Sequence, residues 1–92
     1  MIYRQGDLLI RRVKTIPNEA VKADAVLARG EVTGHSHRAQ QMQVYRTSQQ
    51  TFLKGEGQVV HEEHAPLELP EGTYEVVRQR EYNPTENRLI ND

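Results

Sequence analysis

Short apolar runs separated by glycine, proline and polar turns fill the chain, and this pattern predicts strands. Residues 7–13 form one apolar run with late charges, which predicts a first strand. Residues 25–32 predict a second strand that bends near Arg29 and Gly30. In residues 41–47, side chains alternate with the period of two that a half-buried strand shows. Each of these runs is too short for a helix.

The second half of the chain continues this pattern up to its polar tail. Residues 51–54 predict a short strand, and the glycine-rich residues 55–57 predict a hairpin turn, since glycines supply positive φ. Residues 58–62 would return from that turn. Two prolines favour a crossing or edge segment over residues 65–72, because proline donates no hydrogen bond. Residues 73–82 predict the longest strand.

About six short strands with frequent turns are typical of a small antiparallel β-barrel or sandwich, and we expect this mainly β fold. Residues 17–24 predict a loop or a single helical turn. The whole chain, residues 1–92, is short enough to form one β-barrel-like domain. Because its core must be small and polar, a homodimer is expected.

Composition removes several classes of function. The chain has no cysteine, which excludes disulfides, thiolate metal sites and cysteine nucleophiles. Neither a membrane-spanning apolar stretch nor a secretion signal is visible, so a cytoplasmic protein without membrane contact is expected. A net charge of -1 argues against non-specific binding of duplex DNA. Nine of the 12 basic residues are arginine, which suits bidentate contact with phosphate or carboxylate.

All four histidines lie in two tight clusters, which is the strongest functional signal in the chain. His35 and His37 are two residues apart, so an extended segment presents both imidazoles to one side. His61 and His64 converge only if the strand ends near Glu62. We expect the clusters to mark a site at the rim of the sheet. Surface histidines, or buried and hydrogen-bonded ones, are the alternative.

One chemistry for these histidines is metal binding. The segment with Gly30, Gly34, His35 and His37 resembles the first motif of the cupin superfamily, whose small β-barrels bind a metal through HxH, a following Glu and a distant His. This resemblance implies a divalent transition metal at the histidine clusters, in a dioxygenase, an isomerase or a sensor. The chain departs from the pattern because no Glu follows His37 before Glu56 and the second cupin motif is absent in order.

The other chemistry is acid and base catalysis without a metal or other cofactor. One imidazole removes a proton from a nucleophile, and another protonates the leaving group. Cleavage of RNA needs only the ribose 2′-hydroxyl as nucleophile and cationic donors for the phosphate. Arg38, Arg78 and Arg80 are the predicted donors, and Tyr74 and Tyr82 are predicted to offer stacking rings on the same strand face. A solvated strand face is the alternative for these arginines.

Two acidic residues complete the predicted site. Glu62 and Glu63 would orient an imidazole or join a metal, as carboxylates commonly do behind histidine. The spacing from His61 to His64 is not that of the HExxH zinc protease motif, and no long helix surrounds it. The chain also lacks a P-loop, so nucleotide hydrolysis of that type is not expected.

A longer resemblance runs through residues 4–10, 30–37 and 61–82. Over these segments the chain resembles a widespread group of small, uncharacterised prokaryotic β-proteins. It is also similar to a small CRISPR-associated ring nuclease of antiviral defence, which opens cyclic oligoadenylate messengers without metal in a dimeric β fold. That similarity implies histidine-dependent attack of the 2′-hydroxyl, which leaves 2′,3′-cyclic phosphate ends.

Three hypotheses therefore follow from the sequence. The first is a metal-independent phosphodiesterase that cleaves RNA or cyclic oligonucleotides and uses His35, His37, His61 and His64. The second is a cupin-like metal-binding protein with a four-histidine site. The third is a β module that binds a partner protein through exposed strand edges.

Overall fold

Alternating apolar and polar side chains fold the chain into one antiparallel sheet. The computed structural model describes residues 2–29 and 35–79, and all regular structure within them is β-strand. The seven strands are β1 (Ile2–Gln5), β2 (Leu8–Arg12), β3 (Val21–Ala23), β4 (Val26–Arg29), β5 (Ser36–Arg46), β6 (Thr51–His61) and β7 (His64–Arg78). Their order is β1-β2-β7-β6-β5-β3, and β4 also pairs with β5. The predicted mainly β, antiparallel fold is confirmed.

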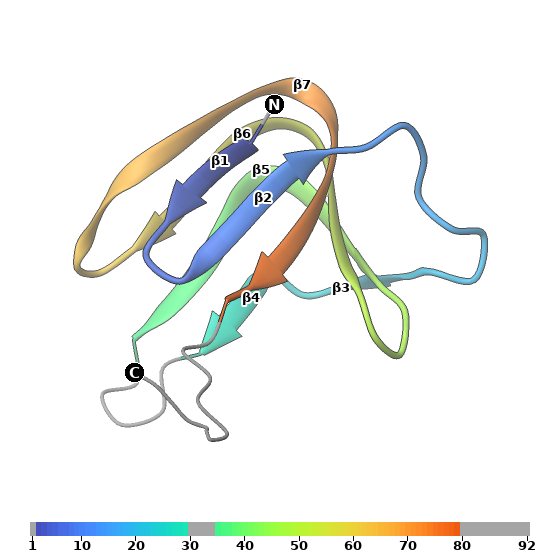
Figure 1. The fold of residues 1–92 in the computed structure, drawn as a ribbon, viewed down its shortest axis with the longest axis horizontal. Helices are drawn as coiled ribbons and strands as arrows, with labels where there is room; N and C mark the ends of the chain where they lie inside the picture. The colour runs from blue at the N-terminus through green and yellow to red at the C-terminus, as the bar shows by residue number, and fades with distance from the viewer. Residues whose placement is uncertain (1, 30–34, 80–92) are drawn as a thin grey trace.

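The sheet is curled but it is not a closed barrel. Among the described residues, β1 and β3 are the two ends of the strand order and do not pair with each other. The long strand β7 bends, so that its first half pairs with β6 alone while its second half also pairs with β2 (Figure 1). The sheet therefore folds over its own inner face like a small sandwich. Within the described parts, no helix is long and apolar enough to cross a membrane.

The predicted hairpin at residues 55–57 is wrong. Strand β6 runs through these residues without a turn, and its register shifts there against both neighbouring strands. A Cβ at Gly57 would collide with the carbonyl oxygen of Gln40, so this glycine permits close approach of β5. The turn lies instead at Glu62 and Glu63, which connect β6 to β7.

The other strand predictions are confirmed in part. Strand β2 matches the first predicted strand. The register of β4 shifts between Val26 and Ala28, which is earlier than the bend predicted near Arg29 and Gly30, and Gly30 lies outside the described residues. Strand β7 unites the proline segment with the start of the predicted last strand. Within residues 2–29 and 35–79, the proline segment pairs with β6 and with no other strand. The segment predicted as a loop contains β3. Residues 30–32 and 80–82 of the predicted strands lie outside the described residues.

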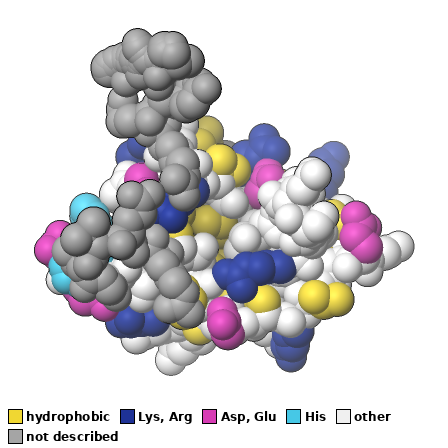
Figure 2. All heavy atoms as spheres, turned by 90° about the horizontal axis from the view of Figure 1, so that it is seen from below, with side chains coloured by type: hydrophobic (Ala, Val, Ile, Leu, Met, Phe, Trp, Pro, Cys, Tyr) yellow, Lys and Arg dark blue, Asp and Glu magenta, His cyan; other side chains and the backbone are white. Residues whose placement is uncertain are grey.

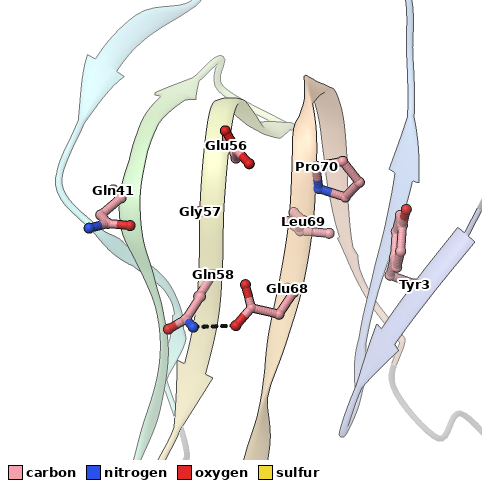
Figure 3. A pocket seen from close by; sticks show the side chains of 8 residues that line it. All are labelled: Tyr3, Gln41, Glu56, Gly57, Gln58, Glu68, Leu69 and Pro70. Atoms are coloured by element: carbon pink, nitrogen blue, oxygen red, sulfur yellow. Dashed lines mark hydrogen bonds between the residues drawn. The ribbon is translucent and has the colours of Figure 1, made fainter.

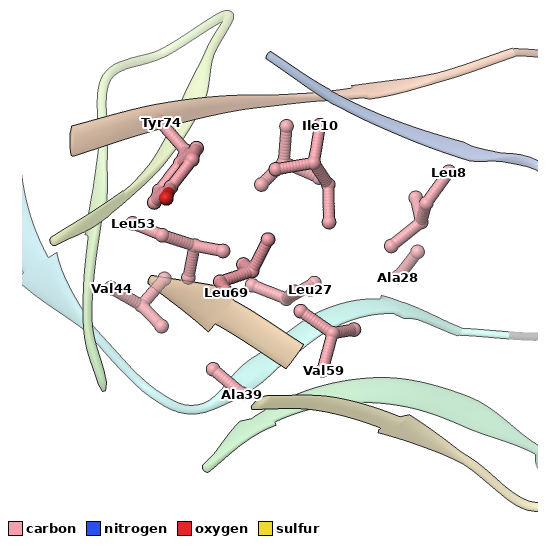
Figure 4. Packing of buried hydrophobic residues seen from close by; sticks show 11 residues of the cluster. Leu8, Ile10, Leu27, Ala28, Ala39, Val44, Leu53, Val59, Leu69 and Tyr74 are labelled. Atoms are coloured by element: carbon pink, nitrogen blue, oxygen red, sulfur yellow. The ribbon is translucent and has the colours of Figure 1, made fainter. Parts of the chain in front are cut away.

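One row of inward-facing side chains forms the core. It runs from Tyr74 at one end to Leu8 and Ala28 at the other, with Leu53 and Leu69 between them (Figure 4). Ala28 is the register partner of His37, and Leu8 follows the turn at Gly6 and Asp7. The end of the core at Leu8 therefore borders the first histidine cluster.

Candidate functional site

The two histidine clusters meet in space. His61 and His64 are register partners that flank the turn between β6 and β7, while His37 belongs to β5 and His35 precedes it. The ring centroid of His61 lies 4.3 Å from that of His37, 4.7 Å from that of His64 and 5.7 Å from that of His35. All four imidazoles therefore gather around His61.

These rings border a cavity at the end of the curled sheet. Its volume is about 270 Å³, and it is lined by Asp7, His35, His37, His61, Glu63, His64 and Arg78. Histidine and acidic side chains gather at one end of the molecule in the space-filling view (Figure 2). The lining therefore brings four imidazoles, two carboxylates and one guanidinium together.

His37 is the buried member of the cluster, and it is only 5% exposed. Its Nδ1 lies 2.9 Å from Oε1 of Gln5, and its Nε2 lies 3.2 Å from Oδ1 of Asp7. Burial lowers the pKa of His37, and the charge of His61 lowers it further, while Asp7 opposes both effects. Both nitrogens of His37 therefore face protein acceptors, and a neutral ring can donate a hydrogen bond to only one of them.

Asp7 links His37 to Arg78. Its Oδ2 accepts a hydrogen bond of 2.9 Å from Nε of Arg78, and its Oδ1 faces His37. Burial raises the pKa of Asp7, but the hydrogen bond and charge of Arg78 outweigh this, so that the pKa lies below its ordinary value. Asp7 is thus a carboxylate that fixes one side of the Arg78 guanidinium.

Glu63 holds two imidazoles in defined states. Its Oε2 lies 3.3 Å from Nδ1 of His35, which favours a proton on Nδ1 and a lone pair on Nε2. Its backbone N–H donates a hydrogen bond of 3.0 Å to Nδ1 of His61. Neutral His61 therefore carries its proton on Nε2 and is a hydrogen-bond donor.

Glu62 acts on the histidine segment from the outside. Its Oε1 accepts a hydrogen bond of 3.0 Å from the backbone N–H of Ser36, between His35 and His37. Its Oε2 lies 3.2 Å from Nη1 of Arg38. The Ser36 hydrogen bond is the main reason that the pKa of Glu62 falls to about 2, and Arg38 contributes to it. Neither of these two contacts joins Glu62 to an imidazole directly, so its predicted orienting role stays a prediction.

The turn between β1 and β2 makes room for the cluster. Gly6 has a φ of 58°, which favours glycine in the first position of a tight two-residue turn. A Cβ at Gly6 would lie 2.7 Å from Nε2 of His64 and 3.3 Å from Cε1 of His37. The lack of a side chain at Gly6 therefore permits both the positive φ of the turn and the close approach of the imidazoles.

The structure distributes the other predicted site residues over several places. Arg78 lines the cavity, whereas Arg38 is paired with Glu62 and Ser36 and is not among the described lining residues. The expectation that Tyr74 offers a stacking ring is wrong, because Tyr74 is fully buried in the core and its hydroxyl donates to the Pro70 carbonyl. Arg80 and Tyr82 lie outside the described residues.

Sequence reasoning missed Gln5, Gly6 and Asp7, which come from the hairpin of β1 and β2. Gln5 and Asp7 are the hydrogen-bond partners of His37 although they are about 30 residues away from it in the chain. Gly6 followed by Asp7 is a turn signal in the sequence. This signal could have indicated a β1–β2 hairpin, but not that the hairpin contacts His37.

A possible metal-ligand set exists among the described residues. His35, His61 and Glu62 place one ligand atom each within 4.8 Å of one another. The cupin-type use of both histidines of HxH does not fit, because the two nitrogens of His37 face Gln5 and Asp7. Nδ1 of His61 already accepts the Glu63 N–H, so a metal would need a different arrangement of His61.

A larger cavity lies away from the histidines. It measures about 520 Å³ and lies among β1, β5, β6 and β7, with Tyr3, Gln41 and Leu69 in its wall (Figure 3). Gln58 donates a hydrogen bond to Glu68 across its lining. No described histidine or arginine lines it, so it offers acceptors and an aromatic ring but no acid and base pair.

Comparison with known proteins gives a family but no characterised relative. Residues 4–79 match the model of a domain of unknown function (DUF8820). No curated protein matches the chain, and no solved structure matches it.

Proposed function

The chain belongs to the DUF8820 family, and from its geometry we propose that it is a metal-independent phosphodiesterase that cleaves RNA or cyclic oligonucleotides. One observation carries this proposal: four imidazoles, Asp7 and Arg78 line or border the same small cavity. Such a cavity supplies a base, an acid and donors for a phosphate, which are the groups that 2′-hydroxyl attack requires.

His35 is the proposed general base. The carboxylate of Glu63 faces its Nδ1, so the lone pair that takes up a proton is on Nε2. A carboxylate behind an imidazole also stabilises the imidazolium that forms when the proton arrives. Glu62 helps to hold this histidine in place through the adjacent Ser36 N–H.

His64 is the proposed general acid. Its side chain is exposed at the mouth of the cavity, beside the ring of His61. No described hydrogen bond or ion pair occupies its nitrogens, so it exchanges protons with solvent and with a substrate.

His61 and Arg78 are the proposed donors to the phosphate. His61 offers its Nε2–H, because its Nδ1 accepts the Glu63 backbone N–H. Arg78 uses Nε for Asp7, and its terminal nitrogens, which make no hydrogen bond within the described part of the chain, are the proposed donors to phosphate oxygens. His37, with both nitrogens facing Gln5 and Asp7, positions these groups rather than transferring a proton.

The proposed reaction breaks one phosphorus–oxygen bond and forms another. His35 takes the 2′-hydroxyl proton as the 2′-oxygen attacks phosphorus, and His64 gives a proton to the departing 5′-oxygen. The products are a 2′,3′-cyclic phosphate and a 5′-hydroxyl. The comparisons show no link to a ring nuclease. Cyclic oligoadenylate as the substrate and a cytoplasmic homodimer as the form of the protein rest on the resemblance drawn from the sequence, and we include both in the proposal.

A metal-binding protein is the second candidate. The ligand atoms of His35, His61 and Glu62, within 4.8 Å of one another, favour it. Zinc, nickel and copper accept such nitrogen and oxygen donors. The proposal without metal is preferred because Glu62, His61 and His37 are each engaged by protein hydrogen bonds in the observed arrangement.

The test is cleavage of cyclic oligoadenylates and short RNAs, with the product ends identified by mass spectrometry. We expect 2′,3′-cyclic phosphate ends, a loss of about 1,000-fold in kcat for His35→Ala and for His64→Ala, and loss of one limb of the pH profile in each. Absence of cleavage, or full activity in all four single His→Ala variants, would overturn the proposal.

A further inference from the structure

Three side chains beside the histidine cavity place ligand atoms around one point. His35 precedes β5, His61 ends β6, and Glu62 begins the turn that follows β6. One ligand atom of each lies within 4.8 Å of the other two, and the rings of His35 and His61 meet edge to face with centroids 5.7 Å apart. Ligand atoms that sit about 2 Å from a zinc ion stand closer together than this, so a small closure of the turn completes the set.

The base atom of His35 is also its metal-binding atom. Oε2 of Glu63 lies 3.3 Å from Nδ1 of His35, so the proton is held on Nδ1 and the lone pair is on Nε2. A carboxylate behind an imidazole is the arrangement that orients metal-binding histidines and makes them better ligands. A metal ion and the proton of a 2′-hydroxyl therefore compete for the same lone pair.

Glu62 supplies the negative charge of the set. Its Oε1 accepts the Ser36 N–H, and its Oε2 accepts from Arg38. Each carboxylate oxygen has two lone pairs, so both oxygens keep one for a metal while they accept these hydrogen bonds. Two imidazoles and a carboxylate suit zinc, and a site with three protein ligands leaves the fourth position to water.

His61 makes the site exchangeable. Its Nδ1 accepts the Glu63 N–H at 3.0 Å, and its neutral ring carries the proton on Nε2. A metal therefore gains a lone pair of His61 only when this hydrogen bond breaks. Because zinc replaces a contact that the protein already makes, the arrangement without metal is stable by itself and the ion can leave again.

We propose that His35, His61 and Glu62 form an exchangeable zinc site that inhibits the phosphodiesterase by occupying Nε2 of the general base. The inhibition rests on the proposed function, whereas zinc binding by these three residues does not. In a protein that depends on a metal, by contrast, the ion would raise activity. His37 takes no part, because it is buried and both of its nitrogens face protein acceptors.

The first measurement follows zinc binding without any substrate. Zn²⁺ is added to chelator-treated protein, and long-range ¹H–¹⁵N NMR reports both ring nitrogens of each histidine. We expect the Nε2 signal of His35 and one nitrogen signal of His61 to move to metal-bound values, while His37 keeps its zinc-free signals. EDTA should restore the first spectrum. Zinc that shifts neither His35 nor His61 would overturn the proposal.

The second measurement compares Glu62→Gln with Glu68→Gln. Both changes remove one exposed carboxylate, but Glu68 accepts from Gln58 and lies outside the ligand set. The amide oxygen in Glu62→Gln still accepts the Ser36 N–H. Competition with a chromogenic chelator measures the zinc affinity, which should fall at least about tenfold in Glu62→Gln and stay at the wild-type value in Glu68→Gln. Equal affinities of the two variants would place the zinc elsewhere and contradict the proposal.

The third measurement is cleavage of cyclic oligoadenylate in the presence of zinc. Saturating zinc should abolish cleavage, and chelator should restore it in full. The inhibition constant should rise in Glu62→Gln by the same factor as the dissociation constant. If metal-free protein cleaves no oligonucleotide, the proposed function falls, while NMR and chelator competition still decide the zinc site. Zinc that raises activity, or that fills the site without inhibition, would overturn the inhibitory role.

Discussion

The two ends of the core bury polar side chains in different ways. At one end, the hydroxyl of Tyr74 donates to the backbone carbonyl of Pro70 at 2.6 Å, and Arg12 covers the ring. Burial raises the pKa of Tyr74, which keeps the phenol neutral. At the other end, His37 is held by the side chains of Gln5 and Asp7.

From this difference we expect one end to serve stability and the other to serve the proposed chemistry. The Pro70 carbonyl satisfies the hydrogen-bonding need of the Tyr74 hydroxyl and does not connect it to another side chain. The ring of Tyr74 therefore acts as part of the apolar core. The partners of His37 are themselves bonded to β6, β7 and Arg78, so a change there reaches the cavity. Substitutions at the two ends should therefore affect different measurements.

The largest expected effect is on stability at the tyrosine end. Tyr74→Ala removes a fully buried ring and should lower the free energy of unfolding by about 3 to 5 kcal/mol. Tyr74→Phe keeps the ring and should cost about 1 kcal/mol. Chemical denaturation measures both values. The comparison fails if Tyr74→Phe abolishes cleavage while the protein remains folded.

At the other end, Arg78→Gln should reduce kcat/KM about 100-fold, because it removes the guanidinium from the cavity. Arg38→Gln is the matched control, since Arg38 pairs with Glu62 outside the lining, and it should cost less than about fivefold. Steady-state kinetics on the same oligonucleotide measure both. Equal losses of kcat/KM in the two variants would show that Arg78 has no special role through its place in the cavity lining.

A glycine pair tests the space around the imidazoles. Gly6→Ala and Gly55→Ala both place a side chain at positive φ, so each should cost about 1 to 2 kcal/mol of stability. Only at Gly6 would the new Cβ approach His64, at 2.7 Å, whereas at Gly55 the nearest atoms are 3.9 Å away. Gly6→Ala alone should therefore lower kcat, by about tenfold. Similar activity of the two variants below their melting temperatures would refute this.

The smallest expected effect concerns pH. The pKa of His37 lies below its ordinary value of 6.5, so the unfolded chain binds this proton more readily than the folded protein does. The stability due to this difference is present above pH 6.5 and is lost as the pH falls through the folded pKa. Thermal melts of wild type and His37→Asn between pH 7.5 and 5 should show a weaker pH dependence in the variant. A wild-type protein that becomes more stable as the pH falls would contradict this prediction.

The sequence predicted the faces of the strands better than their connections. The alternation of side chains predicted that Tyr74 and Arg78 share one face of a strand, and both do point inward. They lie at opposite ends of the core, however, because the strand is long. The hairpin at residues 55–57 was wrong because glycines signal bulges and close approach as well as turns. Glu62 and Glu63, which form the real turn, carry no such signal.

The histidines of the site were predictable from the sequence, but the residues that hold them in place were not. Two short motifs contained every histidine. The sequence predicted that His61 and His64 converge only if the strand ends near Glu62, and the turn at Glu62 and Glu63 does make them register partners. Gln5 bonds carbonyls 54 and 60 residues away, and no local pattern reports such a pairing. Only the folded sheet shows that a buried amide connects the two clusters.

The central claim is that this cavity cleaves phosphodiesters without a metal, and one sample tests it most directly. Elemental analysis of the purified protein is combined with cleavage of cyclic oligoadenylate and RNA in EDTA. The account predicts no stoichiometric metal, undiminished cleavage in chelator, and loss of that cleavage in His64→Ala. Stoichiometric zinc, nickel, iron or copper together with activity that EDTA abolishes would contradict it and favour the metal-binding alternative.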